Sequence, residues 1–280
     1  MWHARLNLEY ARREAPVAQT VLSFRHEGPL RVLQSLYPEG ERICHNVLVH
    51  PPGGLVGGDA LEIQAHLAAG THALVTTPGA TRFYRSQKGL AQQTIRVHLE
   101  TDARLEWLPL ETIAYPDCDG LNQAIFQLDP GAEMMAWDLT ALGLPGANQP
   151  YTRGKFLQHL EIEGVWRERG RLDAEDTALL ASPLGLAGYR CMGTLVLAAG
   201  AAWHPSQRDA LLEAARDCIA EQEDAEAGIA GVTAAHGQVL VLRTLSHWVE
   251  PSQRLLRAVW AAWRERAWAI PAQAPRLWAL

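Results

Sequence analysis

Apolar and polar residues alternate along many short stretches of the first two thirds of the chain. Ile95, Val97 and Leu99 alternate with polar neighbours, and Leu105 and Trp107 resume the pattern after a short break. A period of two residues indicates a β-strand that buries one face and exposes the other. The pattern therefore predicts that this part of the chain is mainly β.

Three of these stretches repeat a strand–turn–strand arrangement. In each copy a leucine is followed three positions later by a residue that favours a turn. The pairs are Leu67 with Gly70, Leu99 with Asp102 and Leu128 with Gly131, and a fainter fourth copy contains Leu160. Repeats of roughly 20 to 50 residues are typical of stacked structures. We predict an elongated β-helix-like body of stacked strand–turn–strand units over residues 1–200. The copies differ too much to decide whether this body coils or forms an antiparallel meander.

The final third of the chain has a different pattern. Apolar residues at helical spacing predict one helix that begins at Ser206, as its N-cap, and stops at Gly228. A second helix is predicted over about residues 252–268, and a β-hairpin that turns at His236-Gly237 separates the two. We therefore expect a C-terminal α+β part over residues 201–280, packed on the body as one continuous structural unit.

Residues 50–59, HPPGGLVGGD, lie between two predicted strands. Pro51 and Pro52 lack N–H donors and end the strand before them. The pairs Gly53 and Gly54, and Gly57 and Gly58, permit positive φ on either side of Leu55-Val56, and Asp59 then begins the next strand. The stretch is predicted to be a compact double turn. A phosphate-binding loop would need Lys and Ser or Thr after Gly58, where this chain has Asp59 and Ala60.

Composition narrows the class of protein. Of the 280 residues 48% are hydrophobic, enough for a sizeable core, and the net charge of −6 argues against nucleic acid as a partner. The longest apolar run, residues 195–203, is interrupted by Gly200 and is too short to cross a membrane. No signal peptide is expected at the N-terminus. The four cysteines, Cys118 among them, are scattered, so we expect a cytoplasmic protein with reduced thiols and no membrane partner.

The 11 histidines do not show the spacing typical of metal ligands. The carboxylates are better candidates for functional residues. Asp59 and Glu62 flank a strand start, Asp138 follows Trp137 in an apolar setting, and Glu168 lies among arginines. The simpler interpretations are a turn cap for Asp59 and a salt bridge for Glu168. Asp138 is harder to dismiss, because a buried carboxylate needs a partner or a function.

A short basic and aromatic stretch, residues 78–89, follows the first of the three repeated stretches. It contains Arg82, Phe83, Tyr84 and Arg85, a composition typical of protein interfaces. We predict that these residues belong to a partner-facing surface or to its immediate support. Alternation along a strand would place one aromatic ring inside and the other outside.

Several motifs, in order along the chain, resemble the urease accessory protein D family (UreD, also called UreH). They are YPEGERICHNVLVHPPGGLVGGDALEI, TTPGATRFYRS, LEWLPLETI, AWDLTALG, GLAG and the terminal APRLWAL. The similarity runs from near residue 20 to the C-terminus. The chain departs from the family's frequent Leu-Gly-Arg-Pro at residues 142–145, and Cys118 matches no family motif.

The resemblance implies a non-enzymatic scaffold in the nickel-insertion complex that matures urease. The implied partners are urease accessory proteins F and G, of which G is a GTPase, and apo-urease. It also implies an elongated β-helix-like body with a helical C-terminal part, and an internal route for nickel. No tightly bound cofactor is expected, only nickel in transit. We expect Asp59, Glu62, Asp138 and, less directly, Glu168 to line or gate that route.

Two other functions compete with this one. A β-solenoid with paired carboxylates is also typical of a carbohydrate-active enzyme, which would expose an aromatic-lined groove. A pure interaction module without nickel traffic is the second alternative. It predicts that urease activation survives every carboxylate substitution.

Overall fold

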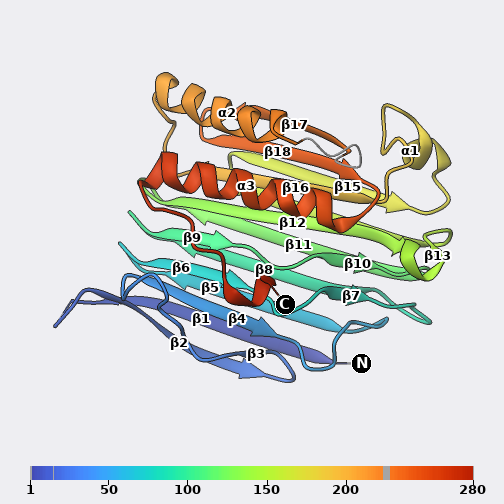
Figure 1. Cartoon of the computed structure of the whole chain (residues 1–280). Coiled ribbons are helices and arrows are strands. Elements are labelled where there is room, and N and C mark those ends of the chain that lie inside the picture. Colours follow the sequence, from blue (N-terminus) through green and yellow to red (C-terminus); the bar gives the residue numbers. More distant parts are fainter. Residues whose placement is uncertain (1, 15, 223–227, 280) are drawn as a thin grey trace.

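Two β-sheets stacked face to face form most of the molecule in the computed structural model, which describes residues 2–14, 16–222 and 228–279 (Figure 1). The first sheet has the strand order β15-β14-β11-β8-β5-β1-β2. Its strands are β1 (His3–Arg13), β2 (Gln19–Glu27), β5 (Ala60–Leu67), β8 (Ala91–Leu99), β11 (Cys118–Leu128), β14 (Gly154–Ile162) and β15 (Trp166–Asp173).

The second sheet has the order β17-β18-β16-β12-β9-β6-β4-β3; in addition, β10 and β13 pair with β12, and β7 pairs with β10. Its main strands are β3 (Arg31–Val32), β4 (Ile43–Val49), β6 (His72–Thr76), β9 (Arg104–Trp107), β12 (Glu133–Leu144), β16 (Cys191–Ala199), β17 (Ile229–His236) and β18 (Val239–Ser246). The short strands are β7 (Thr81–Phe83), β10 (Thr112–Ala114) and β13 (Gln149–Pro150).

The middle of the chain coils and its ends form antiparallel meanders. From β4 to β14 the chain passes repeatedly from one sheet to the other, and successive coils pair in parallel: β5 with β8, β8 with β11, and β11 with β14. By contrast, β1 pairs antiparallel with β2, and β16 pairs antiparallel with both β12 and β18. The predicted β-helix-like body is confirmed. Its middle segment coils, and its two end segments form antiparallel meanders.

The three clear sequence repeats lie in register. Leu67 stands opposite Leu99, and Leu99 opposite Leu128. Their turn residues all have positive φ: 67° at Gly70, 59° at Asp102 and 85° at Gly131. This conformation suits Gly and, to a lesser degree, Asp.

The predicted alignment of the fourth copy is wrong. Leu160 pairs with Ala124 rather than with Leu128. Its strand, β14, turns back into the antiparallel β15 instead of crossing to the second sheet. The strand–turn–strand repeat therefore ends before this copy.

Two hydrophobic cores share the second sheet. Met134 and Ala136 of β12 face the core between the sheets. Met135 and Trp137 face the core beneath the helices. Helices α2 (Pro205–Ala220) and α3 (Val249–Trp268) cover this outer side (Figure 1). Strands buried on both faces become continuously apolar, which explains why β6 and β12 lack the alternation that predicts the strands of the first sheet.

The C-terminal elements agree with the sequence in kind and differ at their ends. Helix α2 has His204 as its N-cap, because Pro205 takes the first helical position. It ends at Ala220, so Gly228 is not its stop, and residues 223–227 of the predicted helix lie outside the described residues. The hairpin of β17 and β18 is confirmed. Helix α3 starts three residues before the predicted position and ends at Trp268 as expected.

A third, short helix was not predicted: α1 (Thr177–Ala181), capped by Asp176. The division of the chain near residue 200 stays a prediction. The second sheet runs across it without a break, since β16 and β18 pair from Cys191–Ser246 to Ala198–Val239. Among the described residues no helix is long and apolar enough to cross a membrane.

A buried charge network fastens α3 to the β body. The Arg264 guanidinium donates to both oxygens of Glu39, at 2.7 and 2.9 Å, and its Nε donates to Glu106 at 3.2 Å. His45 contacts Glu39 and His72 contacts Glu106, each at 2.8 Å. The two carboxylates therefore each hold one histidine and share one arginine, all within the interior.

Candidate functional site

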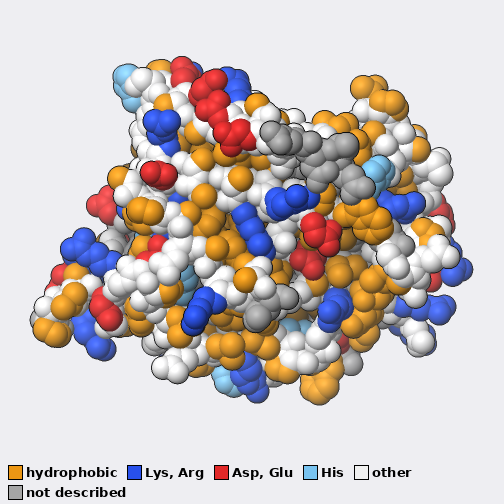
Figure 2. Space-filling model, in the orientation of Figure 1, with side chains coloured by type: hydrophobic (Ala, Val, Ile, Leu, Met, Phe, Trp, Pro, Cys, Tyr) orange, Lys and Arg blue, Asp and Glu red, His pale blue; other side chains and the backbone are white. Residues whose placement is uncertain are grey.

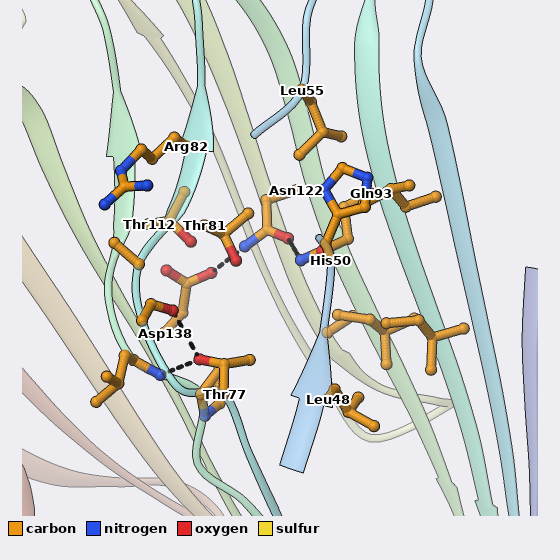
Figure 3. A pocket seen from close by; sticks show the side chains of 18 of the residues that line it. Leu48, His50, Leu55, Thr77, Thr81, Arg82, Gln93, Thr112, Asn122 and Asp138 are labelled. Carbon is orange, nitrogen blue, oxygen red and sulfur yellow. Dashed lines mark hydrogen bonds between the residues drawn. The ribbon is translucent and has the colours of Figure 1, made fainter. Parts of the chain in front are cut away.

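A pocket of about 240 Å³ opens between the two sheets, next to the turn formed by residues 50–59 (Figure 3). Most of its wall is apolar. The polar side chains that line it include His50 at the end of β4, Arg82 on β7, Gln93 on β8, Asn122 on β11 and Asp138 on β12. Strands of both sheets thus bring together residues that lie up to 88 positions apart in the chain.

Asp138 is held by three hydrogen bonds. Asn122 donates to its Oδ2 at 2.8 Å, and Thr140 and Gln158 donate to its Oδ1, each at 3.0 Å. Burial raises the pKa of Asp138, these bonds oppose the rise, and the charge of Glu168 adds to it. A carboxylate with that many donors is positioned rigidly, and its Oδ2 keeps acceptor capacity toward the pocket.

His50 carries a buried polar atom without a partner. Its Nε2 has no hydrogen bond within the described part of the chain. Burial lowers the pKa of His50 below 6.5, although the charge of Asp59 acts in the opposite direction. The ring is therefore neutral at neutral pH, which is the form that binds metal ions. A buried nitrogen left unpaired costs stability and calls for an explanation.

The glycine-rich turn is a corner, as predicted, and Asp59 is its cap. Asp59 is 1% exposed. Its Oδ2 accepts from the Val56 amide at 3.0 Å and its Oδ1 from the Trp2 amide at 2.6 Å. The carboxylate therefore ties the turn to the first strand of the chain.

The four glycines serve the corner in two ways. Gly53 and Gly58 have positive φ, 80° and 91°. Gly54 and Gly57 have ordinary φ but leave no room for a side chain, because a β-carbon on Gly54 would lie 2.8 Å from the Arg82 oxygen and one on Gly57 2.5 Å from the Lys88 oxygen. The expectation of positive φ thus holds for one glycine of each pair.

The glycine-rich turn also binds residues 82–85 of the basic and aromatic stretch through backbone hydrogen bonds. Leu55 donates to the Arg82 carbonyl at 2.7 Å and accepts from the Tyr84 amide at 2.8 Å. Phe83 is fully buried against Phe156, so it supports the surface from within and does not face a partner. Tyr84 is half-buried and stacks edge-on against Tyr115, whereas Arg85 is exposed. One ring is inside, as alternation predicts, and the other is half-buried rather than fully outside.

The other two candidate carboxylates lie in different places. Glu168 on β15 is near Asp138: it accepts from Thr194 at 3.2 Å, and Thr194 stands opposite Asp138 in the strand pair. It also forms the expected salt bridge, with Arg243 of β18. Glu62 lies on the outer face of the first sheet, where it pairs with Arg5 at 2.8 Å and His3 at 3.0 Å.

The described residues contain no group of three or more His, Cys, Asp or Glu arranged to hold a metal ion. Cys118 is buried, and burial raises the pKa of its thiol to about 12. It is thus a poor thiolate ligand at neutral pH.

The comparisons with known proteins agree along the whole chain. A family model described as the UreD urease accessory protein matches residues 3–279. This chain belongs to the UreD family of urease accessory proteins. The urease accessory protein UreD of Variovorax paradoxus (strain S110) is 55% identical over 278 residues, covering 99% of this chain and 99% of that protein. That of Paracidovorax citrulli (strain AAC00-1) is 54% identical over 281 residues, covering 100% and 99%. That of Methylibium petroleiphilum (strain ATCC BAA-1232 / LMG 22953 / PM1) is 49% identical over 295 residues, covering 99% of each.

UreD membership confirms the family resemblance drawn from the motifs, and it points to an accessory rather than a catalytic role. In this UreD-family chain the motifs HPPGGLVGGD and TRFYR meet through Leu55. The sequence did not single out His50 as a pocket residue, nor Gln93, Asn122 and Gln158. Their positions on strands were visible, but polar side chains on an inward face are recognised only when the opposite sheet is known.

Proposed function

We propose that this UreD-family chain is a non-enzymatic scaffold in urease maturation, and that it works in the cytoplasm with accessory proteins F and G to deliver nickel to apo-urease. Family membership supports the maturation role. One structural observation supports the passage of nickel: a row of polar side chains crosses the otherwise apolar interior, from the pocket beside the corner to the far edge of the two sheets.

The row begins on the first sheet. Gln93, Asn122 and Gln158 stand next to one another on β8, β11 and β14. Gln93 donates to Asn122 at 3.1 Å, and Asn122 donates to Asp138 of the second sheet (Figure 3). Gln158 also donates to Asp138. Amide and carboxylate groups of two sheets therefore meet in the middle of the molecule, in the pocket that His50 also lines.

The row continues from Asp138 to the edge of the sheets. Thr194 lies opposite Asp138, and Arg243 lies opposite Thr194, on successive strands of the second sheet. Glu168 reaches both of them from β15, accepting from Thr194 at 3.2 Å and from Arg243 Nε at 2.8 Å. Since β15 is the edge strand of the first sheet, the row ends near the surface.

The chemistry of these groups suits a cargo that must move on. Nickel is a divalent ion of intermediate softness, and sites rich in thiolate or imidazole would hold it strongly. Single carboxylates, amides and one imidazole, completed by water, bind it weakly, and conduction needs sites that are easy to enter and easy to leave. In this scheme His50 takes nickel at the pocket, Asp138 holds it at the centre, and Glu168 passes it to the edge.

Asp59 and Glu62 have different places in this scheme. The carboxylate of Asp59 is engaged by backbone amides, so it contributes negative charge beside His50 rather than an open ligand. Glu62 faces away from the pocket and pairs with Arg5 and His3. We therefore place Asp59 at the entrance and leave Glu62 off the route.

The test compares Asp138→Asn with Glu62→Gln in cells that express the urease genes at limiting nickel. Asp138→Asn should leave accessory proteins F and G and apo-urease bound, while the purified urease carries several-fold less nickel and is correspondingly less active. Glu62→Gln should behave like the wild-type protein. Normal nickel content in the Asp138→Asn urease would favour the pure interaction module instead.

A further inference from the structure

Three large apolar side chains are exposed on the chain segments that meet at the corner. Among the described residues only ten large hydrophobic side chains are exposed, and Trp2 (56% exposed), Val56 (43%) and Leu90 (38%) are three of them. Single exposed apolar residues are common on soluble proteins, but a group is unusual and marks a contact site. We call these three residues, with Arg82, Arg85 and Lys88 around them, the corner surface.

Hydrogen bonds to and around Asp59 join the three chain segments that carry these apolar residues. The carboxylate of Asp59 binds the backbone amides of Trp2 and Val56. The adjacent Gly58 amide donates to the Leu90 carbonyl at 3.1 Å, and the Ala60 amide donates to the Trp2 carbonyl at 2.9 Å. The three residues come from separate segments of the chain, so the arrangement is built by the fold and is not a local run of apolar sequence.

The rim of the corner surface is basic and unneutralised. Within the part of the chain that the structure describes, Arg82, Arg85 and Lys88 form no ion pair. The carboxylates nearby are engaged elsewhere: Asp59 is buried, and Asp117 pairs with Arg153 at 3.0 Å. In a chain with a net charge of −6, this is a local reversal of sign. Figure 2 shows Lys and Arg side chains at the right-hand edge, where the loop after β7 lies in Figure 1.

We propose that the corner surface docks a folded protein whose contact area has an apolar centre and an acidic rim. A surface that combines an exposed Trp with arginines has the composition of an interface centre, and an acidic rim would complement the three cations. The surface adjoins the pocket, since Arg82 belongs to both, and Gly53 and Gly54 of the turn that carries Val56 also line the pocket. A partner bound here would therefore cover the pocket entrance.

In this arrangement Asp59 is a positioning residue for the interface. Its buried carboxylate accepts from two backbone amides, and an Asn side chain has one acceptor oxygen and one donor group in their place. Asp59→Asn should thus weaken the links from residue 59 to the Trp2 and Val56 backbones and reduce docking. Because Asp59 also lies at the entrance of the proposed route, its effect on docking is measured by partner binding and not by the nickel content of urease.

The test measures binding of the full chain to immobilised accessory protein F, accessory protein G and apo-urease, each separately; the inference rests on the proposed function for this choice of partners. The triple variant Trp2→Ser, Val56→Ser, Leu90→Ser should bind one of them about ten-fold or more weakly. Arg85→Glu with Lys88→Glu should slow association with the same protein, and added salt should reduce that effect. The control, Leu36→Ser with Leu184→Ser, changes exposed apolar residues elsewhere (54% and 100% exposed) and should bind normally.

Thermal melting first establishes that each variant is folded. The proposal is overturned if the folded triple variant binds all three proteins within about two-fold of the wild-type protein. It is also overturned if the three side chains instead mediate self-association, seen by light scattering, or binding to vesicles of anionic phospholipid. Normal docking of the corner variants together with low nickel for Asp138→Asn would refute the corner surface alone. The reverse pattern would refute the nickel route alone.

Discussion

Arg264 of α3 and Glu39 of the loop before β4 are 225 residues apart in the chain, yet they form an ion pair with two hydrogen bonds of 2.7 and 2.9 Å. The side chain of Arg264 is fully buried and that of Glu39 is 7% exposed. The C-terminal helix is thus joined to the first coil of the β body by charges that are shielded from water. A buried charge that loses its partner is strongly destabilising.

We therefore expect Arg264→Met to lower the free energy of unfolding by about 3–5 kcal/mol, because Glu39 and Glu106 would keep their charges without the arginine. Urea unfolding followed by tryptophan fluorescence measures this, since Trp260 lies beside the network and donates to Glu106. Arg266→Met, an exposed change two residues away, should alter stability by less than about 0.5 kcal/mol. Equal stability of the two variants would contradict the role of the network.

The same network predicts a response to acid. Burial pushes the pKa of Glu39 upward, but hydrogen bonds from His45 and Arg264 outweigh it and hold the pKa below 4.5. A carboxyl group with a lowered pKa stabilises the fold above its ordinary pKa, and the contribution is lost as the pH falls through the lowered value. The wild-type protein should lose more stability than Glu39→Gln when the pH is lowered from 5 through that range, as measured by thermal melting. Glu163→Gln, on the surface, should follow the wild-type curve.

A substitution of His50 should reduce nickel delivery without lowering the stability of the fold. Its Nε2 is buried without a partner among the described residues, so an apolar side chain of similar size removes an unsatisfied group. His50→Leu should melt at the same temperature as the wild-type protein or higher, while the urease it matures contains less nickel. A variant that is less stable and delivers nickel normally would show that His50 is structural.

Gly54 should tolerate no side chain. A β-carbon there would lie 2.8 Å from the Arg82 carbonyl oxygen and would also press against the Tyr84 ring. Gly54→Ala should destabilise the protein by about 1–3 kcal/mol, as other overpacked sites do. Gly79→Ala is the matched control, because a β-carbon on Gly79 would meet no other side chain or backbone segment within 4 Å. Chemical denaturation of both variants tests the difference.

The isolated chain should hydrolyse neither GTP nor ATP. The backbone amides that would hold a phosphate in the glycine-rich turn are used within the protein: Gly53 donates to His50 at 2.8 Å, Gly58 to Leu90 at 3.1 Å and Asp59 to Val56 at 3.0 Å. Phosphate release from either nucleotide, abolished by a substitution at Gly53 or Gly58, would contradict this. GTP hydrolysis is expected only when accessory protein G is added.

Much of the local structure is evident in the sequence. The alternation on β8, the spacing of Leu67, Leu99 and Leu128, and the glycines that follow the prolines at residues 51–52 predicted strands, repeat and corner, and the structure confirms them. These features depend on residues close in the chain, whose steric limits and burial pattern act locally. The motifs were sufficient to identify the family for the same reason, because each is a short run of residues.

Tertiary structure alone decided which of these pieces meet. No local pattern indicates that Asp138 faces Asn122 and Gln158, or that Glu168 reaches Arg243. A strand shows which of its residues share a face, but which strand lies opposite is determined by packing across the whole body. Charge pairing and desolvation, which shape the candidate site, depend on those long-range distances and on burial, and therefore appear only in the folded chain.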